Sequence, residues 1–478
     1  MSGHLFQRRI AAVIAASLLG GCASTQVREN FGSAQDFTRE RLGVEVRWLD
    51  TDEARREAQT EVDALLQKPL SADDAVRIAL AYSPSLQAML FASAASSASA
   101  AQSARLPNPI FTFERLVRNE GGIRELEINR MLAISVFDLF LLPSRLRAAG
   151  FAQQQARLKL TGDVVQTALD ARQAWVRAVG AQQSLQYSEQ VKRAADASSE
   201  LARRMQQVGN FSKLQRAREQ AFAADAVAQL ARARQTALGA REGLIRALGL
   251  DEAQARKLQL PERLPDLPPS PVDEATALQS AIDQRLDVSA ARAELEFSAR
   301  EEGLTQITSV INGFDIAGVY DSETGKAPKK GYELEIALPI FDFGDALRTG
   351  AQARYMAQLN RTAQLAVNAT SEVRQSYGAY RTAYDIARHY RDEIVPLRKV
   401  IADENVLRYN GMLIGVFELL ADAREQIGSV VQAVDAHRDF WLADAALKGA
   451  IIGKPVGQPQ SVVEMEATPS SGATARAH

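Results

Sequence analysis

Residues 332–341 read YELEIALPIF, and residues 125–137 read ELEINRMLAISVF. In both stretches every second residue is apolar, with only Arg130 interrupting the series: Leu126, Ile128, Leu132, Ile134 and Val136, then Tyr332, Leu334, Ile336, Leu338 and Ile340. The positions between them are mostly acidic or small, and the acidic ones are Glu125, Glu127, Glu333 and Glu335. A period of two predicts β-strands with one apolar and one polar face.

Each of these strands follows a shorter β-prone stretch, at 109–118 and at 313–320. The intervening turns contain glycine, so we expect β-hairpins over 109–137 and 313–341. Strands of about ten residues with a single apolar face are typical of outer-membrane β-barrels. The alternative is a soluble hairpin whose apolar face lies on a helix.

Four strands are too few for a transmembrane barrel, because about eight is the minimum and open edges in lipid leave backbone groups unpaired. If the strands span a membrane, several chains must share one barrel: three chains would supply twelve strands and two chains eight. The inner wall would carry Glu125, Glu127, Glu333 and Glu335, so it would enclose water.

The stretches around the hairpins predict very long helices. Residues 144–208 contain no proline and are rich in good helix formers, with Pro143 and Ser144 as the expected start. At 1.5 Å per residue such a helix reaches roughly 95 Å, too long for a compact domain to enclose. Further helices are expected at 212–248, 345–410 and 413–451, with Pro396 bending the third of the four.

These features occur twice in the same order, which indicates an internal repeat of about 200 residues. The first copy covers 70–260, a proline-rich linker covers 261–271, and the second copy covers 272–452. In each copy a glycine near the end of the long helix predicts a turn, at Gly209 and at Gly411. Residues 453–478 are expected to be a disordered tail.

The N-terminus has the order of a bacterial secretory signal over residues 1–21. Arg8 and Arg9 precede the apolar stretch 10–19, and Gly20 and Gly21 lead to Cys22, the only cysteine. A cysteine directly after the cleavage site is the residue that bacterial lipoproteins acylate, for example with palmitate. We therefore expect residues 22–69 to form a lipidated N-terminal segment, and we expect the outer membrane as its destination.

Composition excludes several other classes of function. The net charge of −2 gives no basis for nucleic-acid binding. After Cys22 no apolar run is long enough for a transmembrane helix. His389 and His437 have no nearby histidine or cysteine, so no metal site is expected. The sequence contains no phosphate-binding loop and no catalytic signature, so we expect neither a cofactor nor an enzyme.

Two motifs resemble those of a known family. Residues 337–344, ALPIFDFG, resemble the end-of-strand motif of the TolC-type outer-membrane efflux factors. Arg408-Tyr409-Asn410-Gly411, followed by LLADAR at 419–424, resembles the helix-turn motif of that family. The resemblance extends over residues 70–452, in both copies.

The resemblance implies a mainly α fold in which a long α-helical barrel continues a β-barrel that three chains share. It implies a homotrimer that spans the outer membrane and docks to a periplasmic adaptor and an inner-membrane pump, often of the resistance-nodulation-division type. Residues 412–420 look most like the heavy-metal and copper-resistance branch, which would make metal ions the cargo. Type I protein secretion and a structural coiled-coil lipoprotein are the alternatives.

The resemblance also places the turns at Gly209 and Gly411 at the periplasmic tip of the channel. Glu418 and Asp422 are four residues apart, so they share one helix face just past the second turn. Three-fold symmetry would arrange them as rings of carboxylates at the pore entrance. Arg408, Tyr409 and Arg424 lie near the same turn, and either arginine could pair with these acids. The alternative is a solvated helix face.

Overall fold

We describe the fold from a computed structural model of the chain. The described residues are 22–120, 123–309, 314–336, 338 and 340–454. The expected signal peptide and the tail from residue 455 onward lie outside them. The helices are α2 (Cys22–Leu42), α3 (Asp52–Leu65), α4 (Ala72–Tyr82), α5 (Pro84–Ser103), α6 (Val136–Gln207), α7 (Lys213–Leu248), α8 (Glu252–Lys257), α9 (Glu274–Gln284), α10 (Leu286–Thr308), α11 (Asp345–His389), α12 (Val395–Asn410) and α13 (Val416–Ile452). The strands are β1 (Ile110–Glu120), β2 (Ile123–Ser135), β3 (Phe314–Glu323) and β4 (Lys329–Ile336). The predicted fold class, mainly α with a small β part, is confirmed.

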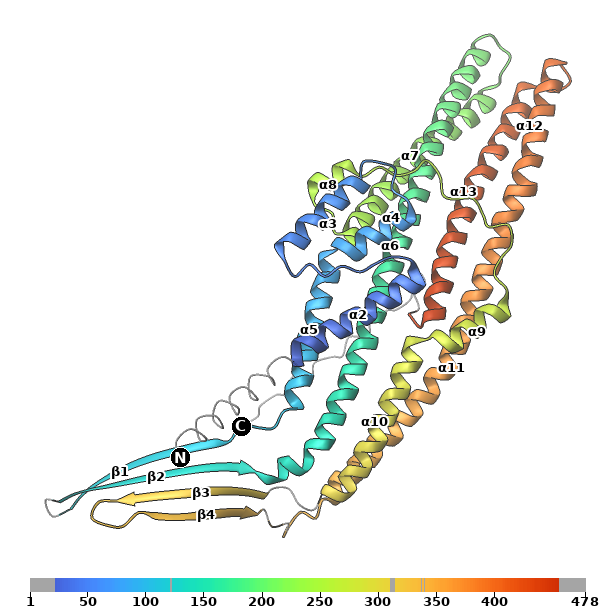
Figure 1. The fold of residues 1–478 in the computed structure, drawn as a ribbon. Coiled ribbons are helices and arrows are strands. Elements are labelled where there is room, and N and C mark those ends of the chain that lie inside the picture. The colour runs from blue at the N-terminus through green and yellow to red at the C-terminus, as the bar shows by residue number, and fades with distance from the viewer. Residues whose placement is uncertain (1–21, 121–122, 310–313, 337, 339, 455–478) are drawn as a thin grey trace, which may run out of the picture.

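The molecule is elongated (Figure 1). The sheet lies at one end, and the turns that join α6 to α7 and α12 to α13 lie at the other. The shorter helices α3, α4 and α8 form a belt beside the middle of the long ones. The order of elements in the first half, two helices, a hairpin and two long helices, recurs in the second half.

The four strands form one antiparallel sheet in the order β1-β2-β3-β4. The two hairpins therefore pair through β2 and β3, and Met131 lies opposite Val319. Strands β1 and β4 are the two edges. Strand β4 ends at Ile336, five residues before the predicted end, so Leu338 and Ile340 do not belong to the strand. Val136 likewise belongs to helix α6.

Helix α6 begins at Val136, eight residues earlier than predicted from Pro143 and Ser144. The hydroxyl of Ser135 caps it by accepting a hydrogen bond from the backbone N–H of Asp138 (3.4 Å). Pro143 is accommodated inside the helix, within its first turns. The sequence favoured a start at the proline, since a proline commonly marks the beginning of a helix. Here a serine cap upstream determines the start instead.

The helix type changes directly before Pro396, where the sequence predicts a bend. Residues Tyr390–Ile394 form a single π-helical turn between α11 and α12. A proline has no N–H to donate, and its ring collides with the carbonyl four residues earlier. The wider turn directly before Pro396 relieves that collision, which is a common use of such insertions. In the second copy, the last helix begins at Val416, three residues later than predicted.

A buried core in the middle of the molecule holds the belt to the long helices. Trp175 of α6 packs with Leu244 and Leu248 of α7. Its indole N–H donates to the carbonyl oxygen of Leu70 (2.7 Å) and so fixes the start of α4. The proline-rich linker is held to the second copy, where the hydroxyl of Tyr384 donates to the carbonyl of Pro268 (3.1 Å).

Among the described helices, none is by itself long and apolar enough to cross a bilayer, although the bent pair α4 and α5 meets that test by length and composition.

Candidate functional site: the sheet and the helical tips

The register of the sheet places the predicted carboxylates on one face. Directly opposed residues of an antiparallel pair lie on the same face, so the register assigns each strand residue to a face. Eight carboxylates with described side chains share the face predicted to be the lumen: Glu114, Glu125, Glu127, Asp315, Asp321, Glu323, Glu333 and Glu335. The sequence identified four of these. The other four lie on β1 and β3, whose faces become defined only through their pairing.

Several of these carboxylates lie directly opposite one another. Glu127 lies opposite Glu323, and Asp315 lies opposite Glu335. Like charges in this position destabilise a sheet, because their side chains are only about 5 Å apart at the Cβ atoms. Water screens that repulsion, whereas a dry environment amplifies it. The arrangement therefore suits a face that lines water.

The two helical turns have the same backbone hydrogen bonds. In the first, the N–H of Asn210 donates to the carbonyl of Met205 (2.8 Å). In the second, the N–H of Leu413 donates to the carbonyl of Arg408 (2.8 Å). A constant offset of 203 residues therefore superposes one turn on the other.

The two predicted turn glycines, Gly209 and Gly411, do not occupy the same position under this offset. Gly209 has φ +80°, the left-handed conformation that glycine favours. Its counterpart is Met412, which has φ +59°, while Gly411 has an ordinary φ of −79°. Both turns were predicted at glycines because glycine is the usual residue in such a turn.

The same offset relates two partly or fully buried carboxylates. Glu219 of α7 and Asp422 of α13 each lie seven residues after the residue that precedes the helix. Glu219 is completely buried, and it accepts a hydrogen bond from the Ser198 hydroxyl of α6 (2.5 Å). Asp422 is half-buried and accepts a hydrogen bond from the amide of the buried Asn405 in α12.

Arg424 of α13 links the helix pair α12 and α13 to the helix pair α6 and α7. Its guanidinium forms an ion pair with Glu219 and lies 4.7 Å from the centroid of the Phe222 ring. The sequence raised the pairing of Arg424 with Glu418 or Asp422, but its partner here is Glu219 of the other copy. Ile427 of α13 packs nearby against Val191 and Phe222. Sequence reasoning missed Glu219 and Ser198. An alignment of the two copies at an offset of 203 would have found Glu219, since it matches Asp422.

The remaining predicted tip residues are exposed. Glu418 is exposed on α13, and Arg408 and Tyr409 are exposed at the end of α12. Glu418 and Asp422 therefore differ in environment, although they share a helix. The tips also expose large apolar side chains: Val208, Leu214, Leu407, Met412 and Leu413. Such clustered apolar exposure is typical of a protein–protein contact.

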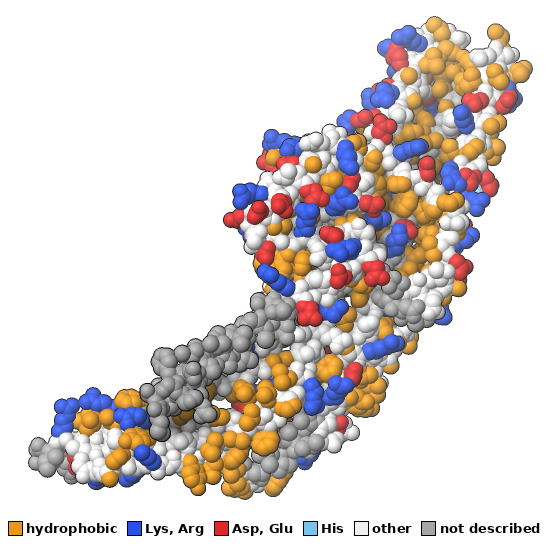
Figure 2. Space-filling model, in the orientation of Figure 1, with side chains coloured by type: hydrophobic (Ala, Val, Ile, Leu, Met, Phe, Trp, Pro, Cys, Tyr) orange, Lys and Arg blue, Asp and Glu red, His pale blue; other side chains and the backbone are white. Residues whose placement is uncertain are grey.

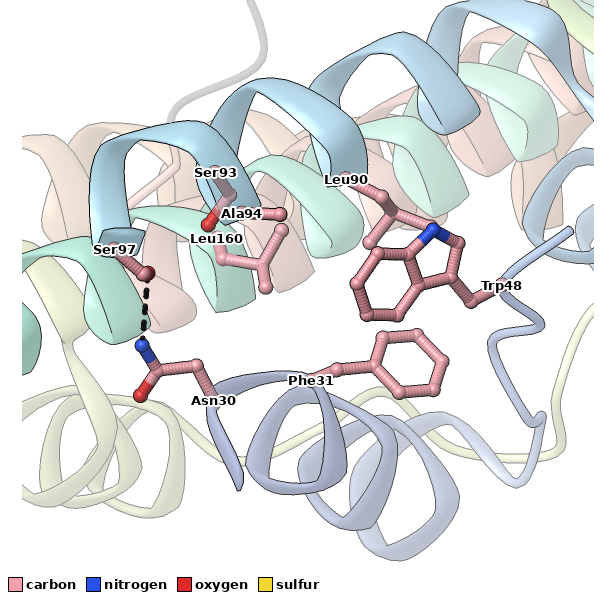
Figure 3. A pocket seen from close by; sticks show the side chains of 8 residues that line it. All are labelled: Asn30, Phe31, Trp48, Leu90, Ser93, Ala94, Ser97 and Leu160. Atoms are coloured by element: carbon pink, nitrogen blue, oxygen red, sulfur yellow. Dashed lines mark hydrogen bonds between the residues drawn. The ribbon is translucent and has the colours of Figure 1, made fainter. Parts of the chain in front are cut away.

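Helix α2 crosses α5 and α6 between the sheet and the belt. Figure 3 shows Phe31 and Trp48 facing one another beside Leu90, with ring centroids 5.5 Å apart. The amide of Asn30 donates to the hydroxyl of Ser97 (3.1 Å). The first turn of α2, which begins at Cys22, lies at the end of the helix nearer the sheet (Figure 1).

The described residues contain no group of three or more histidine, cysteine or acidic side chains placed to hold a metal ion. His437 is half-buried beside Trp441, whose indole N–H donates to its Nε2 (3.3 Å). His389 is exposed and lies 3.2 Å from Glu393.

Comparison with known proteins identifies the fold. No family model matches the chain, and no curated protein matches it. Among solved structures it is similar to CusC, described for its transmembrane channel formation, with 14% identity over 80% of this chain and 92% of that one (TM-score 0.66). It is similar to the outer-membrane channel OprN, with 17% identity over 86% and 98% (TM-score 0.66). It is also similar to the outer-membrane channel CmeC of Campylobacter jejuni, with 14% identity over 83% and 86% (TM-score 0.66). The resemblance to TolC-type channels is thus confirmed at the level of the fold.

Proposed function

We propose that this chain is the outer-membrane channel of a tripartite efflux system, a passive duct formed by three copies. The sheet carries the proposal. Its two edges, β1 and β4, pair with no further strand among the described residues. One face is acidic, while the other exposes large apolar side chains such as Leu132, Leu334 and Ile336. A membrane is the environment in which such an apolar face is stable, and closure into a barrel removes the edges.

Three copies give a barrel of twelve strands in which β1 of one chain pairs with β4 of the next. The acidic face then lines the water-filled lumen with Glu125, Glu127, Glu333 and Glu335. The helices continue the duct into the periplasm. Helix α6 has 72 residues, which corresponds to about 108 Å.

Cys22 is the proposed lipid attachment point after removal of residues 1–21. The position of the first turn of α2, nearer to the sheet than to the tips, supports this assignment. Each buried CH₂ of an acyl chain contributes about 0.8 kcal/mol, so several chains anchor stably. Cys22→Ser should abolish palmitate labelling and leave barrel insertion intact. Equal labelling of the variant would exclude lipidation at this residue.

The exposed apolar side chains at the two tips are the proposed contact with a periplasmic adaptor, and the adaptor connects the channel to an inner-membrane pump. Rings of Glu418, with Asp422 behind them, would favour cations at the entrance. The likeness of residues 412–420 to the heavy-metal branch is the support for metal ions as cargo.

Single-channel recording in planar bilayers tests the proposed function. Purified protein should conduct, and crosslinking of detergent-extracted protein should stop at three chains. A monodisperse monomer without conductance, with its β content intact, would contradict the duct and support a structural lipoprotein. Deletion of the gene should sensitise cells to metals or small toxic compounds. If it instead abolished export of a protein, the channel would belong to a secretion system.

A further inference from the structure

The two faces of the sheet differ in their acidic side chains, although the acidic face also carries Arg118 and Lys329. Among strand residues with described side chains, all eight carboxylates lie on the proposed lumen face. The apolar face has no carboxylate and carries four cationic side chains: Arg115, Arg124, Arg130 and Lys330. Lys and Arg side chains gather near the hairpin end of the sheet (Figure 2).

Two of these cations lie in one row across the sheet. Arg130 of β2 is directly opposite Tyr320 of β3, which is directly opposite Lys330 of β4. The guanidinium carbon of Arg130 lies 5.5 Å from the centroid of the Tyr320 ring, and the ammonium nitrogen of Lys330 lies 5.6 Å from it. Tyr320 thus attracts two cations by cation–π interactions, one from each neighbouring strand. Arg115 lies diagonally across from Arg130, within reach of its side chain.

The row has no internal counter-charge. Within the described part of the chain, no ion pair is formed by Arg115, Arg130 or Lys330, and the carboxylates of the neighbouring strand positions point to the opposite face. The two cations of the row are separated by two strand spacings, about 9.5 Å at the backbone. Their long side chains can converge on one anion over the Tyr320 ring.

The position of the row along the strands determines its depth in the proposed barrel. Lys330 is six residues from Ile336, the last residue of β4, which corresponds to about 20 Å along the strand. The apolar band of an outer-membrane barrel is about 25 Å tall and is bordered by aromatic residues. Measured along β4, the row with Tyr320 therefore lies near the outer border of the apolar band, while Ile128 and Leu126 continue the apolar face of β2 beyond it. Tyr332, Leu334 and Ile336 continue the same face toward the periplasmic side.

We propose that Arg130, Tyr320 and Lys330, with Arg115 beside them, form a binding site on the outer wall of the barrel for phosphate-bearing lipid headgroups of the outer leaflet. This inference rests on the proposed function, because it needs the apolar face to meet lipid. The chemistry matches an anionic amphiphile. The acyl chains lie on the apolar strip of β4 and β2, and the phosphate lies against the cations. Arginine binds phosphate through two parallel N–H donors, and lysine adds a point charge.

The test compares the Arg130→Gln/Lys330→Gln double variant with Lys329→Gln. Lys329 is adjacent to Lys330 but lies on the acidic face, opposite Asp321, so its loss removes a charge without touching the row. The probes are dioleoyl phosphatidic acid, which carries a phosphate monoester, and zwitterionic dioleoyl phosphatidylcholine. Lipids bound to the detergent-solubilised protein are counted by native mass spectrometry.

Wild-type protein and Lys329→Gln should each prefer phosphatidic acid at least fivefold, and the double variant should lose that preference. An unchanged preference in the double variant would overturn the site. Displacement of the lipid by millimolar inorganic phosphate would also overturn it, in favour of a free-anion site. Conductance in phosphatidylcholine bilayers is recorded for all three proteins. If the wild-type protein does not conduct, the proposed duct itself is refuted. If all three proteins conduct equally and only the double variant loses its lipid preference, the result supports the lipid site.

Discussion

A single backbone conformation distinguishes the two helical tips. Gly209 and Met412 occupy the same left-handed position in turns with the same hydrogen bonds, but only the first is a glycine. A side chain in this conformation costs about 1–2 kcal/mol. Met412 is 93% exposed, so its side chain makes few contacts that could offset the strain. The second turn is therefore the weaker of the two.

Met412→Gly should stabilise the second turn. The substitution relieves the backbone strain of the left-handed conformation, but glycine loses more backbone entropy than methionine when the chain folds. The net gain in stability is about 0.5–1 kcal/mol. Hydrogen exchange of the amides at 411–415 should slow about two- to fivefold, with unchanged exchange at 208–212. Gly209→Ala is the matched control and should speed exchange in the first turn. Faster exchange after Met412→Gly would show that the methionine side chain holds the turn.

Arg424 is the counter-charge of a fully buried carboxylate. Arg424→Met would leave Glu219 buried without its ion pair, which costs about 3 kcal/mol for a pair of this kind. The double variant Glu219→Gln/Arg424→Met should recover most of that loss in urea denaturation. Arg398→Met is the control, because its partner Glu425 is more than half exposed and such pairs contribute at most about 1 kcal/mol. Equal losses for Arg398→Met and Arg424→Met would contradict the special role of the buried pair.

At the scale of elements, period-two alternation was sufficient to predict β2 and β4 and their faces. It did not predict where β4 ends, because Leu338 and Ile340 continue the apolar alternation past the last paired residue, Ile336. The long helices were predicted from composition. The predicted first residues of these helices differ from the observed ones. A cap such as Ser135 acts through one hydrogen bond, and composition gives little indication of it. Glu219 was missed because its burial depends on contact with a helix 205 residues away.

Leu334→Lys tests the assignment of faces. A lysine on the lipid face of a barrel costs about 2–4 kcal/mol near mid-depth, and three chains triple the cost for the assembly. Insertion into outer membranes, measured as heat-resistant trimer, should fall sharply. Glu335→Lys, one residue away on the opposite face, should insert like wild type. If the two variants insert equally, the apolar face does not meet lipid.

His437 of helix α13 lies beside the linker, close to Pro265 and Asp266. Burial is the main cause that lowers the pKa of His437 below its ordinary value of 6.5, and Arg391 and Arg263 act in the same direction. The unfolded chain therefore binds a proton more readily than the folded one. Stability should be constant above about pH 6.5 and should fall as the pH decreases below it.

His437→Gln should remove this slope, because glutamine does not titrate in that range. Urea midpoints at pH 7.5 and pH 5.5 measure it, with His389→Gln as the control, since His389 is exposed. A slope that persists unchanged in His437→Gln would assign the pH dependence to other groups.

At the scale of the whole molecule, the order of elements and the doubling of the chain were visible in the sequence because both rest on local patterns. The long-range pairing of β2 with β3, which joins the two copies, follows from tertiary structure alone. It also joins the strands of the two copies in a single sheet. Toward the tips, the ion pair of Arg424 and Glu219 connects the two copies again.

The free edges of the sheet have a genetic consequence. A chain whose β4 edge is blocked, for example by Glu333→Pro, would still offer an intact β1 edge to its neighbour. It would enter mixed assemblies, and each blocked chain would leave one seam of its barrel unclosed. With equal amounts of normal and blocked chains, only about one assembly in eight would contain three normal copies. Such an allele should therefore be dominant, and cells that carry both copies should lose most of their efflux, whereas a deletion of the gene should be recessive.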